Sequence, residues 1–365
     1  MEDIIFHSLV GLDNLGVNCF FNCGIQIILH SYNFMIDILD DIKMNLLYNK
    51  YNKNSISSGF MELCKLIIQN YLIYNDINTD KITSVDISKN KCNYFNYPEK
   101  RNNLSICPKN FLNLFTKIHP VYKDSEEDAV EFIRVLLNDL SVENNYNNPY
   151  VEYKELSFEG KTKSKLSKEY HDNYIKKENS AIIKNYYFQM VNIYICSCGY
   201  ESYSFDKYLD LPLLIPEEKK DYKLIDLIRY HLNSTVTNWI YKCENCKENN
   251  MNHYKLEKFD MISKYFIIYI QRMNKFLKTK NTSNIKFDEI LNLNEFCDDE
   301  LKAIGIKLKL VGIIYHNGLL ESGHYYTIFK IHDKWFRFND NRVTLINKIE
   351  FESEEACAFL YEKYN

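Results

Sequence analysis

Apolar residues in the first half of the chain recur at helical spacing. Residues 19–31 read CFFNCGIQIILHS and predict a mostly buried helix, weakened at Gly24 unless another backbone comes close there. A second helix follows Ser125, because apolar residues recur three, four, seven, eight and eleven positions after Ala129. Ser125 is the candidate cap, and carboxylates follow in the first turn, where the helix dipole favours them: Glu126, Glu127 and Asp128.

The second half of the chain has the composition of strands. Helices followed by strands predict an α+β protein with a mainly antiparallel sheet. We interpret the polar residues 141–180 as an insertion or a mobile connection, and 275–284 as a long loop. The predicted strands are rich in aromatic and β-branched residues and cover 188–195, 264–271, 307–315, 325–330 and 334–338.

Length and composition indicate a globular chain. It has 365 residues, of which 46% are hydrophobic and 26% charged, and its 10 Gly and 6 Pro are too few for a collagen-like or linker protein. No apolar run approaches the roughly 20 residues of a membrane helix, and the acidic start at Glu2 and Asp3 is unlike a signal peptide. We therefore expect an intracellular protein, cytoplasmic or nuclear, that is neither secreted nor membrane-spanning.

Charge and cysteine content narrow the chemistry. A formal net charge of −4 gives no basic field, so we expect neither a nucleic-acid nor a membrane partner. Eleven cysteines in a long chain without an export signal are interpreted as reduced thiols. Some of them would lie in the core, some would bind metal, and one is a candidate nucleophile.

Cys19 is that candidate. It opens the 19–31 helix, and a thiol at a helix N-terminus faces backbone N–H groups and the positive end of the dipole, which favour the thiolate. Asn14, five residues upstream, lies on a loop that can fold over the sulfur and donate to an oxyanion. The alternative is a buried core thiol, which is how we interpret Cys23, one helical turn later.

A histidine near the other end of the chain has a polar partner at hairpin spacing. If the strands around His332 form a hairpin, His324 faces Asp340 or, one step of register away, Asn339. A base with a group that orients it is the logic of a Cys–His catalytic unit. Adjacent strand residues point to opposite faces, so only one of the two is expected to reach the imidazole. The alternative is a structural histidine, to which we assign His316.

Two cysteine pairs predict a metal site. Cys196 with Cys198, and Cys243 with Cys246, supply four thiols, and four thiolates at tetrahedral geometry make a closed structural zinc site. The first pair is one residue shorter than the usual spacing, so the alternatives are unmetallated thiols or a metal-free hairpin. With zinc, the flanking strands would form a protruding β-ribbon pinned at its tip.

Together these segments resemble the ubiquitin-specific protease family, papain-like cysteine proteases that remove ubiquitin from proteins. The resemblance covers nearly the whole chain, and the joint order of the boxes carries it. The similar segments are GLDNLGVNCFFN (11–22), EEDAVEF (126–132), the cysteine pairs with LDLPL (209–213), FIIYIQR (266–272), HNG (316–318) with GHY (323–325), WFRFND (335–340) and AFLYEK (358–363).

Carried over by position, the resemblance implies a catalytic set. Cys19 becomes the nucleophile, His324 the general base and Asn339 the group that orients it. Asn14 becomes the oxyanion donor, and Asp340 a neighbour that assists the oxyanion. The residues that fall where the family grips the ubiquitin tail are Asp128, Glu131 and Tyr325.

The resemblance also implies a papain-like α+β fold in a single catalytic domain, 1–365. Its parts are a helical thumb (about 1–140), the polar insertion (about 141–180), zinc-ribbon-like β fingers (about 181–265) and an antiparallel β-sheet palm (about 266–365).

Three positions depart from the family pattern. Val17-Asn18 stands where the family has Asn-Thr, Glu126-Glu127 replaces two glutamines, and the first cysteine pair is short. None removes a catalytic residue. We therefore expect a deubiquitinase that cleaves isopeptide or peptide bonds after the ubiquitin C-terminal glycine through a Cys19 acyl-enzyme.

The expected cofactor is structural Zn²⁺, with no catalytic cofactor. The expected partners are ubiquitin and ubiquitinated proteins, and we expect a monomer. The alternatives are a protease of the same fold for another ubiquitin-like modifier, and a catalytically weak ubiquitin-binding module.

Overall fold

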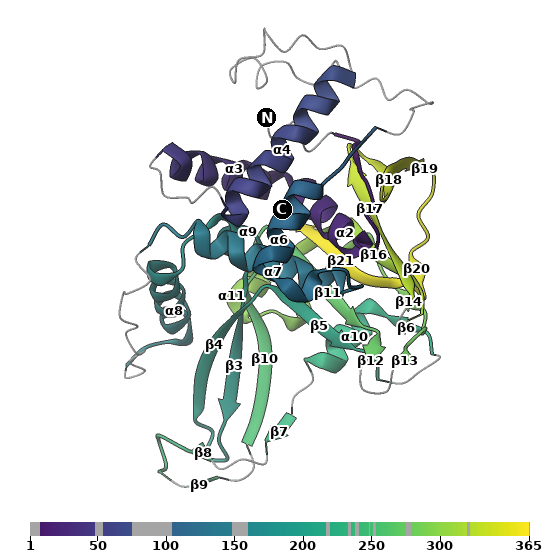
Figure 1. Cartoon of the computed structure of the whole chain (residues 1–365). Helices are drawn as coiled ribbons and strands as arrows, with labels where there is room; N and C mark the ends of the chain where they lie inside the picture. The colour runs from purple at the N-terminus through teal and green to yellow at the C-terminus, as the bar shows by residue number, and fades with distance from the viewer. Residues whose placement is uncertain are drawn as a thin grey trace.

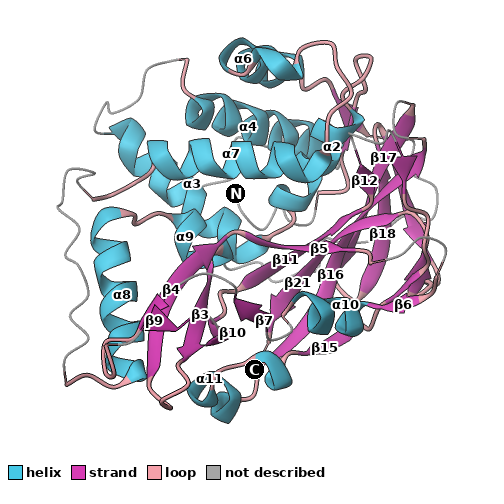
Figure 2. Cartoon of the chain, turned by 90° about the horizontal axis from the view of Figure 1, so that it is seen from below, coloured by secondary structure: helices cyan, strands magenta, loops and turns pink. Residues whose placement is uncertain are grey.

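Helices pack on one face of a large sheet, and a narrower sheet extends away from both (Figure 1). Seen from below, most of the helices gather along one side and the strands along the other, and short helices also lie among the strands (Figure 2). This is the predicted α+β architecture. The computed structural model describes residues 8–47, 54–74, 104–147, 160–216, 220–232, 235–237, 241–247, 249–250, 253–274, 279–319 and 322–364.

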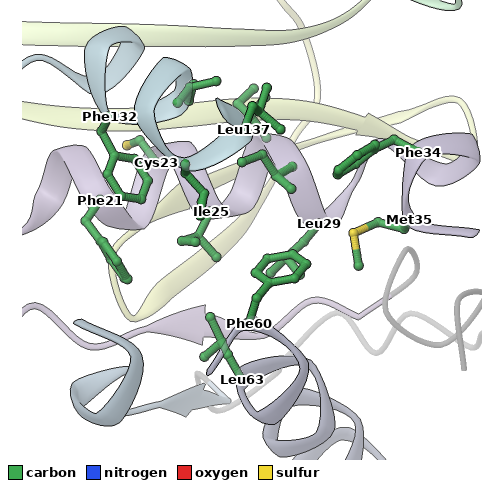
Figure 3. Packing of buried hydrophobic residues seen from close by; sticks show 14 of the residues in the cluster. Phe21, Cys23, Ile25, Leu29, Phe34, Met35, Phe60, Leu63, Phe132 and Leu137 are labelled. Atoms are coloured by element: carbon green, nitrogen blue, oxygen red, sulfur yellow. The ribbon is translucent and has the colours of Figure 1, made fainter. Parts of the chain in front are cut away.

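Helix α2 (Cys19–Leu29) is the centre of the helical layer. All of its residues are buried, because it lies between the other helices and strand β17 (Gly323–Ile331) of the large sheet. The layer also contains α3 (Tyr32–Leu47), α4 (Ile56–Tyr74), α6 (Lys109–Ile118), α7 (Ala129–Glu143) and α9 (Ala181–Tyr186). Figure 3 shows part of the cluster they form: Phe21, Ile25 and Leu29 with Phe60, Phe132 and Leu137.

Gly24 lets α7 come close to α2. A Cβ built on Gly24 would lie only 2.5 Å from Cδ1 of Phe132, closer than real Cβ atoms approach a neighbour. The close approach expected from the sequence therefore exists, but an aromatic ring makes it rather than a backbone.

Helix α7 begins later than predicted. Asp128 is its N-cap, since Oδ1 accepts from the N–H groups of Val130 (2.8 Å) and Glu131 (3.0 Å). Ser125 Oγ instead donates to the carbonyl of Val121 at 2.7 Å, so the prediction that Ser125 caps the helix is wrong. A carboxylate at this end also complements the helix dipole.

The large sheet carries the predicted C-terminal strands. Its strands lie side by side in the order β19-β18-β17-β16-β21-β11-β5, and β15 pairs with β16. Among these strands, only β5 is parallel to its neighbour, β11. The expectation of a mainly antiparallel sheet is confirmed. These strands are β5 (Asp210–Leu214), β11 (Tyr265–Gln271), β15 (Ile290–Asn292), β16 (Lys307–Gly318), β18 (Lys334–Asn339), β19 (Arg342–Ile346) and β21 (Ala356–Lys363).

Both faces of this sheet are covered. Ile267 of β11 belongs to the hydrophobic cluster shared with the helices, whereas Ile268, next in the strand, belongs to a second cluster on the opposite face. Successive side chains of a strand point to opposite faces, so a strand buried on both sides has a continuous apolar sequence.

The narrower sheet has the order β4-β3-β10-β7 and points away from the helices in Figure 1. Its strands are β3 (Phe188–Ile195), β4 (Glu201–Tyr208), β7 (Thr235–Thr237) and β10 (His253–Met261). The short β8 (Tyr241–Lys242) pairs with β9 (Asn249–Asn250) near its far end.

Short elements complete the described chain. Two of them, β1 (Gly11–Leu12) and β2 (Ser105–Ile106), pair beside the large sheet. The others are β6 (Tyr222–Lys223), β12 (Met273–Asn274), β13 (Thr279–Lys280), β14 (Ile285–Lys286), β20 (Glu352–Ser353), α8 (Lys163–Lys177), α10 (Leu224–His231), α11 (Asp299–Ile304), η2 (Pro120–Tyr122) and η3 (Asn294–Phe296).

The two polar segments contain more structure than predicted. Within 141–180, helix α8 starts at the cap residue Thr162 and packs Leu166 against Val191 and Phe205 of the narrow sheet. Within 275–284, β13 pairs with β12. Residues 148–159 and 275–278 lie outside the described part of the chain. Among the described residues, none of the helices is both long and apolar enough to cross a membrane.

Candidate active site

Strand β1 connects the segment before Cys19 to the turn after β18. The N–H of Leu12 donates to the carbonyl of Asp340 at 3.0 Å. A Cβ on Gly11 would lie 2.6 Å from the carbonyl carbon of Asn341, so only glycine fits between β1 and the turn after β18. This contact places the loop before Cys19 beside the hairpin that carries the candidate base.

Cys19 is the first residue of α2, and its side chain is buried. His324 lies on β17 and hydrogen-bonds the Cys19 thiol. This bond is the largest influence on the pKa of His324; burial opposes it, and the contacts with Asn339 and Asp340 support it, so the pKa rises to about 9. The geometry therefore favours an imidazolium that faces the sulfur of Cys19.

The second ring nitrogen of His324 has the predicted partner. Nε2 lies 2.6 Å from Oδ1 of Asn339 and 3.7 Å from Oδ2 of Asp340. Because an amide oxygen can only accept, Nε2 carries the proton of this bond, and Nδ1 is the nitrogen left for the thiol. Asn339 is therefore placed to fix both the tautomer and the ring orientation of His324.

The hairpin register differs from the prediction by one residue. The pairs from Thr327↔Phe338 to Ile331↔Lys334 centre the turn between His332 and Asp333, which have φ of 46° and 60°. If this register continued to the start of β17, His324 would lie opposite residue 341. The diagonal neighbour, residue 339, lies on the same face, which is how its amide reaches the imidazole.

Asp340 does not follow the strand pattern. Its φ of 50° takes it out of the extended conformation at the turn between β18 and β19. Its carboxylate lies near the same ring nitrogen, but at 3.7 Å it is too far to accept a hydrogen bond, so Asn339 alone of the two binds the imidazole, as expected. Asp tolerates this left-handed backbone better than most residues.

Amide groups surround the Asp340 carboxylate. Oδ2 accepts from Nδ2 of Asn14 at 3.0 Å, and Oδ1 accepts from Nδ2 of Asn22 at 2.8 Å. Asn14 Oδ1 in turn accepts from the N–H of Gly16 at 3.0 Å. The predicted oxyanion donor thus lies at the site. Asn22 was not predicted; the available signal was an amide three residues after Cys19 in an otherwise apolar run.

Asp128, one of the predicted tail-binding residues, adjoins the same hairpin. While Oδ1 caps α7, Oδ2 accepts from the hydroxyl of Tyr269 at 2.9 Å. Tyr325 is buried, its pKa is raised well above the ordinary value by burial and by the nearby Asp128 carboxylate, and its hydroxyl accepts from the N–H of Ala129. The structure thus brings Asp128 and Tyr325 together at the start of α7.

Glu131, the third predicted tail residue, lies one turn further along α7 and is half exposed. It accepts from Arg134 at 3.0 Å. Arg134 also binds both oxygens of Asp210, at 2.9 and 2.6 Å, and its guanidinium lies 5.2 Å from the ring centroid of Tyr269. This ion-pair group was not predicted, because it depends on how α7 meets β5 and β11.

His316 has the structural position that the sequence suggested. It is buried, its ring centroid lies 4.4 Å from that of Tyr325, and burial lowers its pKa to about 4, so the ring is neutral. Nδ1 has no hydrogen-bond partner among the described residues. Its backbone carbonyl accepts from Nζ of Lys280, which also binds the carbonyl of Gly318, each at 2.7 Å.

The four predicted metal ligands gather at the end of the narrow sheet. The sulfur atoms of Cys196, Cys198, Cys243 and Cys246 all lie within 4.8 Å of one another and could hold a metal ion. The turn between β3 and β4 carries the first pair: the N–H of Gly199 donates to the carbonyl of Cys196 at 2.9 Å. The N–H of Lys247 closes the second turn on the carbonyl of Cys243 at 2.9 Å.

Comparison with known proteins gives a consistent result. The family model described as "Ubiquitin carboxyl-terminal hydrolase" matches residues 10–361. The chain is 24% identical to ubiquitin carboxyl-terminal hydrolase 8 of Saccharomyces cerevisiae, over 97% of this chain and 70% of that protein. It is 23% identical to the probable ubiquitin carboxyl-terminal hydrolase R319 of Acanthamoeba polyphaga mimivirus, over 97% and 90%.

Solved structures agree on the fold. A SAGA DUB module of Ubp8, Sgf11, Sus1 and Sgf73 bound to monoubiquitin contains a chain that matches with a TM-score of 0.66 and 20% identity, covering 100% of this chain and 71% of that one. The Ubp8 module bound to ubiquitin aldehyde matches with a TM-score of 0.64 and 19% identity, over 100% and 71%.

Proposed function

The chain belongs to the ubiquitin carboxyl-terminal hydrolase family and is a cysteine-type deubiquitinating peptidase, and we propose that Cys19, His324 and Asn339 carry its reaction. The observation that supports this assignment is the position of His324, which binds the Cys19 thiol with one ring nitrogen and Asn339 with the other. That arrangement is a nucleophile, a base and a group that orients the base.

In the first step the thiolate of Cys19 attacks the carbonyl carbon of the bond after the terminal glycine of ubiquitin. The imidazolium of His324, which holds the former thiol proton, donates it to the departing amine as the C–N bond breaks. A thioester between Cys19 and ubiquitin remains. His324, now neutral, takes a proton from water, and the resulting hydroxide attacks the thioester carbon. The C–S bond breaks, which releases ubiquitin with a free carboxylate and returns the Cys19 thiolate beside the imidazolium.

Each attack places negative charge on the carbonyl oxygen, and we assign its stabilisation to Asn14. The amide nitrogen of Asn14 has two hydrogens, of which the bond to Asp340 needs one. The other is available to the oxyanion. Preorganised donors of this kind are worth about 100-fold to 1,000-fold in rate.

The side chains near the start of α7 could bind the extended tail of ubiquitin. Asp128 is held rigidly by its cap bonds and by Tyr269, so its carboxylate is a fixed acceptor for backbone N–H groups or a basic side chain. Glu131 adds negative charge, partly neutralised by Arg134. Tyr325 would contribute the wall beneath them. A tail ending in two glycines can enter a narrow channel that side chains elsewhere would block.

We assign the metal of the four-cysteine cluster as structural zinc. With a Zn–S distance of about 2.3 Å, a tetrahedral site sets neighbouring sulfur atoms about 3.8 Å apart. Two sulfur pairs fit this distance: Cys196 to Cys246 is 3.9 Å, and Cys198 to Cys243 is 3.7 Å. When bound, zinc would join the β3–β4 turn to the β8–β9 hairpin. Four protein ligands leave no open position for a substrate, so its contribution is to stability.

The proposed activity is tested with ubiquitin that carries a fluorogenic amide at its C-terminus. The chain is expected to hydrolyse it, and Cys19→Ala to leave it intact. Parallel substrates made from ubiquitin-like modifiers decide whether ubiquitin is preferred. Similar solved structures are multi-subunit modules, so the monomeric state expected for this chain, like its cytoplasmic or nuclear location, stays a prediction.

A further inference from the structure

Asn18 occupies the N-cap position of α2, but its side chain does not cap the helix. An Asn there ordinarily accepts from N–H groups two or three residues later. Oδ1 of Asn18 instead accepts from the upstream N–H of Leu15 at 2.6 Å, and Nδ2 donates to Oδ1 of Asn22 at 3.2 Å. Both asparagines are at least 96% buried, with exposures of 4% and 2%. The Asn18 amide therefore joins the loop before Cys19 to the first turn of α2.

The bond between the two asparagines is one of the contacts that fix the orientation of the Asn22 amide. Because Asn18 holds its oxygen, the Asn22 nitrogen points to Asp340 and to the carbonyls of Leu12 (3.2 Å) and Asp13 (3.4 Å). A reversed amide would present its oxygen to these groups, all of which are acceptors. It would also turn its nitrogen towards the Asn18 donor, so Asn18 and these acceptors together hold the observed orientation.

Asp340 transmits this constraint to the oxyanion donor. Its two oxygens are divided between two amides, with Asn22 on Oδ1 and Asn14 on Oδ2. Without Asn22 the carboxylate could rotate, and the Asn14 amide would follow it. A carboxylate near a developing negative charge also opposes catalysis unless donors hold and neutralise it.

We propose that Asn18 is a positioning residue for both oxyanion-forming steps. Through Asn22 and Asp340 it holds the Asn14 amide where the oxyanion forms. The inference rests on the proposed function, in which Asn14 is the oxyanion donor. Asn18 departs from the family pattern, and the bonds of its amide to Leu15 and Asn22 give this departure a role.

Asn18→Asp tests the proposal, because it keeps the shape and the acceptor for Leu15 but removes the donor to Asn22. Loss of an oxyanion donor costs about 100-fold to 1,000-fold, and loss of its positioning should cost less, about 10-fold in kcat with KM within about 2-fold. Alkylation of Cys19 by iodoacetamide forms no oxyanion, so its rate should stay within about 2-fold of wild type when it is compared at high pH, where the thiol is ionised in both proteins despite the added carboxylate. A parallel loss of alkylation would indicate a collapsed loop and would overturn the proposal.

A double-mutant cycle identifies the route. If Asn18 acts through Asn14, Asn18→Asp combined with Asn14→Ala should be no slower than Asn14→Ala alone. Multiplied effects of the two substitutions would overturn the proposal.

Asn45→Asp is the matched control. Asn45 is buried in the helical layer, and its Nδ2 donates to Oδ1 of Asn144 at 3.3 Å, so this variant loses the same kind of amide–amide bond away from the site. It should melt at a lower temperature with unchanged kcat. If Asn18→Asp shows only that behaviour, the proposal is wrong. If the wild-type chain does not hydrolyse the substrate, the proposed function is wrong, and this inference fails with it.

Discussion

His324 and Asn339 meet diagonally across the hairpin of β17 and β18, with Nε2 and Oδ1 2.6 Å apart. The strand register would place residue 341, not residue 339, directly opposite the histidine. The contact is therefore a diagonal one, between side chains offset by two residues on the same face. The orientation of the base therefore rests on one amide.

Replacing that amide should disable the base without unfolding the chain. In Asn339→Ala the imidazole loses its fixed tautomer and orientation, and kcat/KM should fall about 100-fold or more. Asn339→Asp keeps an acceptor at the same position and should retain much more activity. Initial rates on the fluorogenic ubiquitin amide check both variants. Equal activity of wild type and Asn339→Ala would contradict the assigned role.

The raised pKa of His324 predicts the alkaline limb of the pH profile. The imidazolium donates to the leaving amine, so kcat/KM should fall as pH rises through about 9. Because the Asn339 bond supports the raised pKa, the limb should move to lower pH in Asn339→Ala. Rates across pH 6 to 10 test this, and a limb near the ordinary histidine pKa in wild type would contradict it.

The raised pKa of His324 also predicts how the stability of the fold depends on pH. A pKa higher in the folded chain than in the unfolded one stabilises the fold fully below the unfolded value of about 6.5, and this stabilisation is lost as pH rises through about 9. Urea unfolding of wild type and His324→Gln at pH 6 and pH 9.5 measures it. The difference between the two proteins should be larger at pH 6, and a difference independent of pH would speak against the raised value.

The Asp128 carboxylate should act on substrate binding rather than on chemistry. Asp128→Asn keeps an acceptor for the N–H groups of Val130 and Glu131, so α7 stays capped, but the charge is lost. We expect KM for the ubiquitin amide to rise about 10-fold with a smaller change in kcat. Glu127→Gln, one residue earlier, is the charge-matched control. Equal effects of the two substitutions would argue against a specific tail contact.

Metal content tests the four-cysteine cluster. Wild type should hold about one equivalent of zinc, and Cys243→Ser should lose it and melt at a lower temperature, since structural zinc adds to folding stability. Cys107→Ser is the control, because Cys107 is an exposed thiol outside the cluster. Metal content unchanged in Cys243→Ser would refute the site.

Local patterns predicted the candidate catalytic residues and five of the longer strands, β3, β11, β16, β17 and β18. His324 and Asn339 could be paired from hairpin spacing, although the register was one residue off. The positive φ of His332 and Asp333 centres the turn between them, and symmetric counting around His332 does not show this. The strand that contains Ile267 was found because burial on both faces leaves a continuous apolar run.

Features that depend on tertiary contacts were missed. Helix α8 buries little more than Leu166 and Ser167, so its polar sequence shows no apolar period. The role of Asn22 depends on a turn 318 residues later in the chain. A buried amide in an apolar helix signals a partner, but the sequence alone does not identify it.

The most direct measurement uses ubiquitin that carries an electrophile at its C-terminus. After incubation, the intact mass should increase by one ubiquitin, and peptide mapping should place the bond on the sulfur of Cys19. Cys19→Ala should form no adduct, and Asn339→Ala should form it more slowly. No adduct with the wild-type chain, or an adduct that persists in Cys19→Ala, would contradict the assignment of the nucleophile.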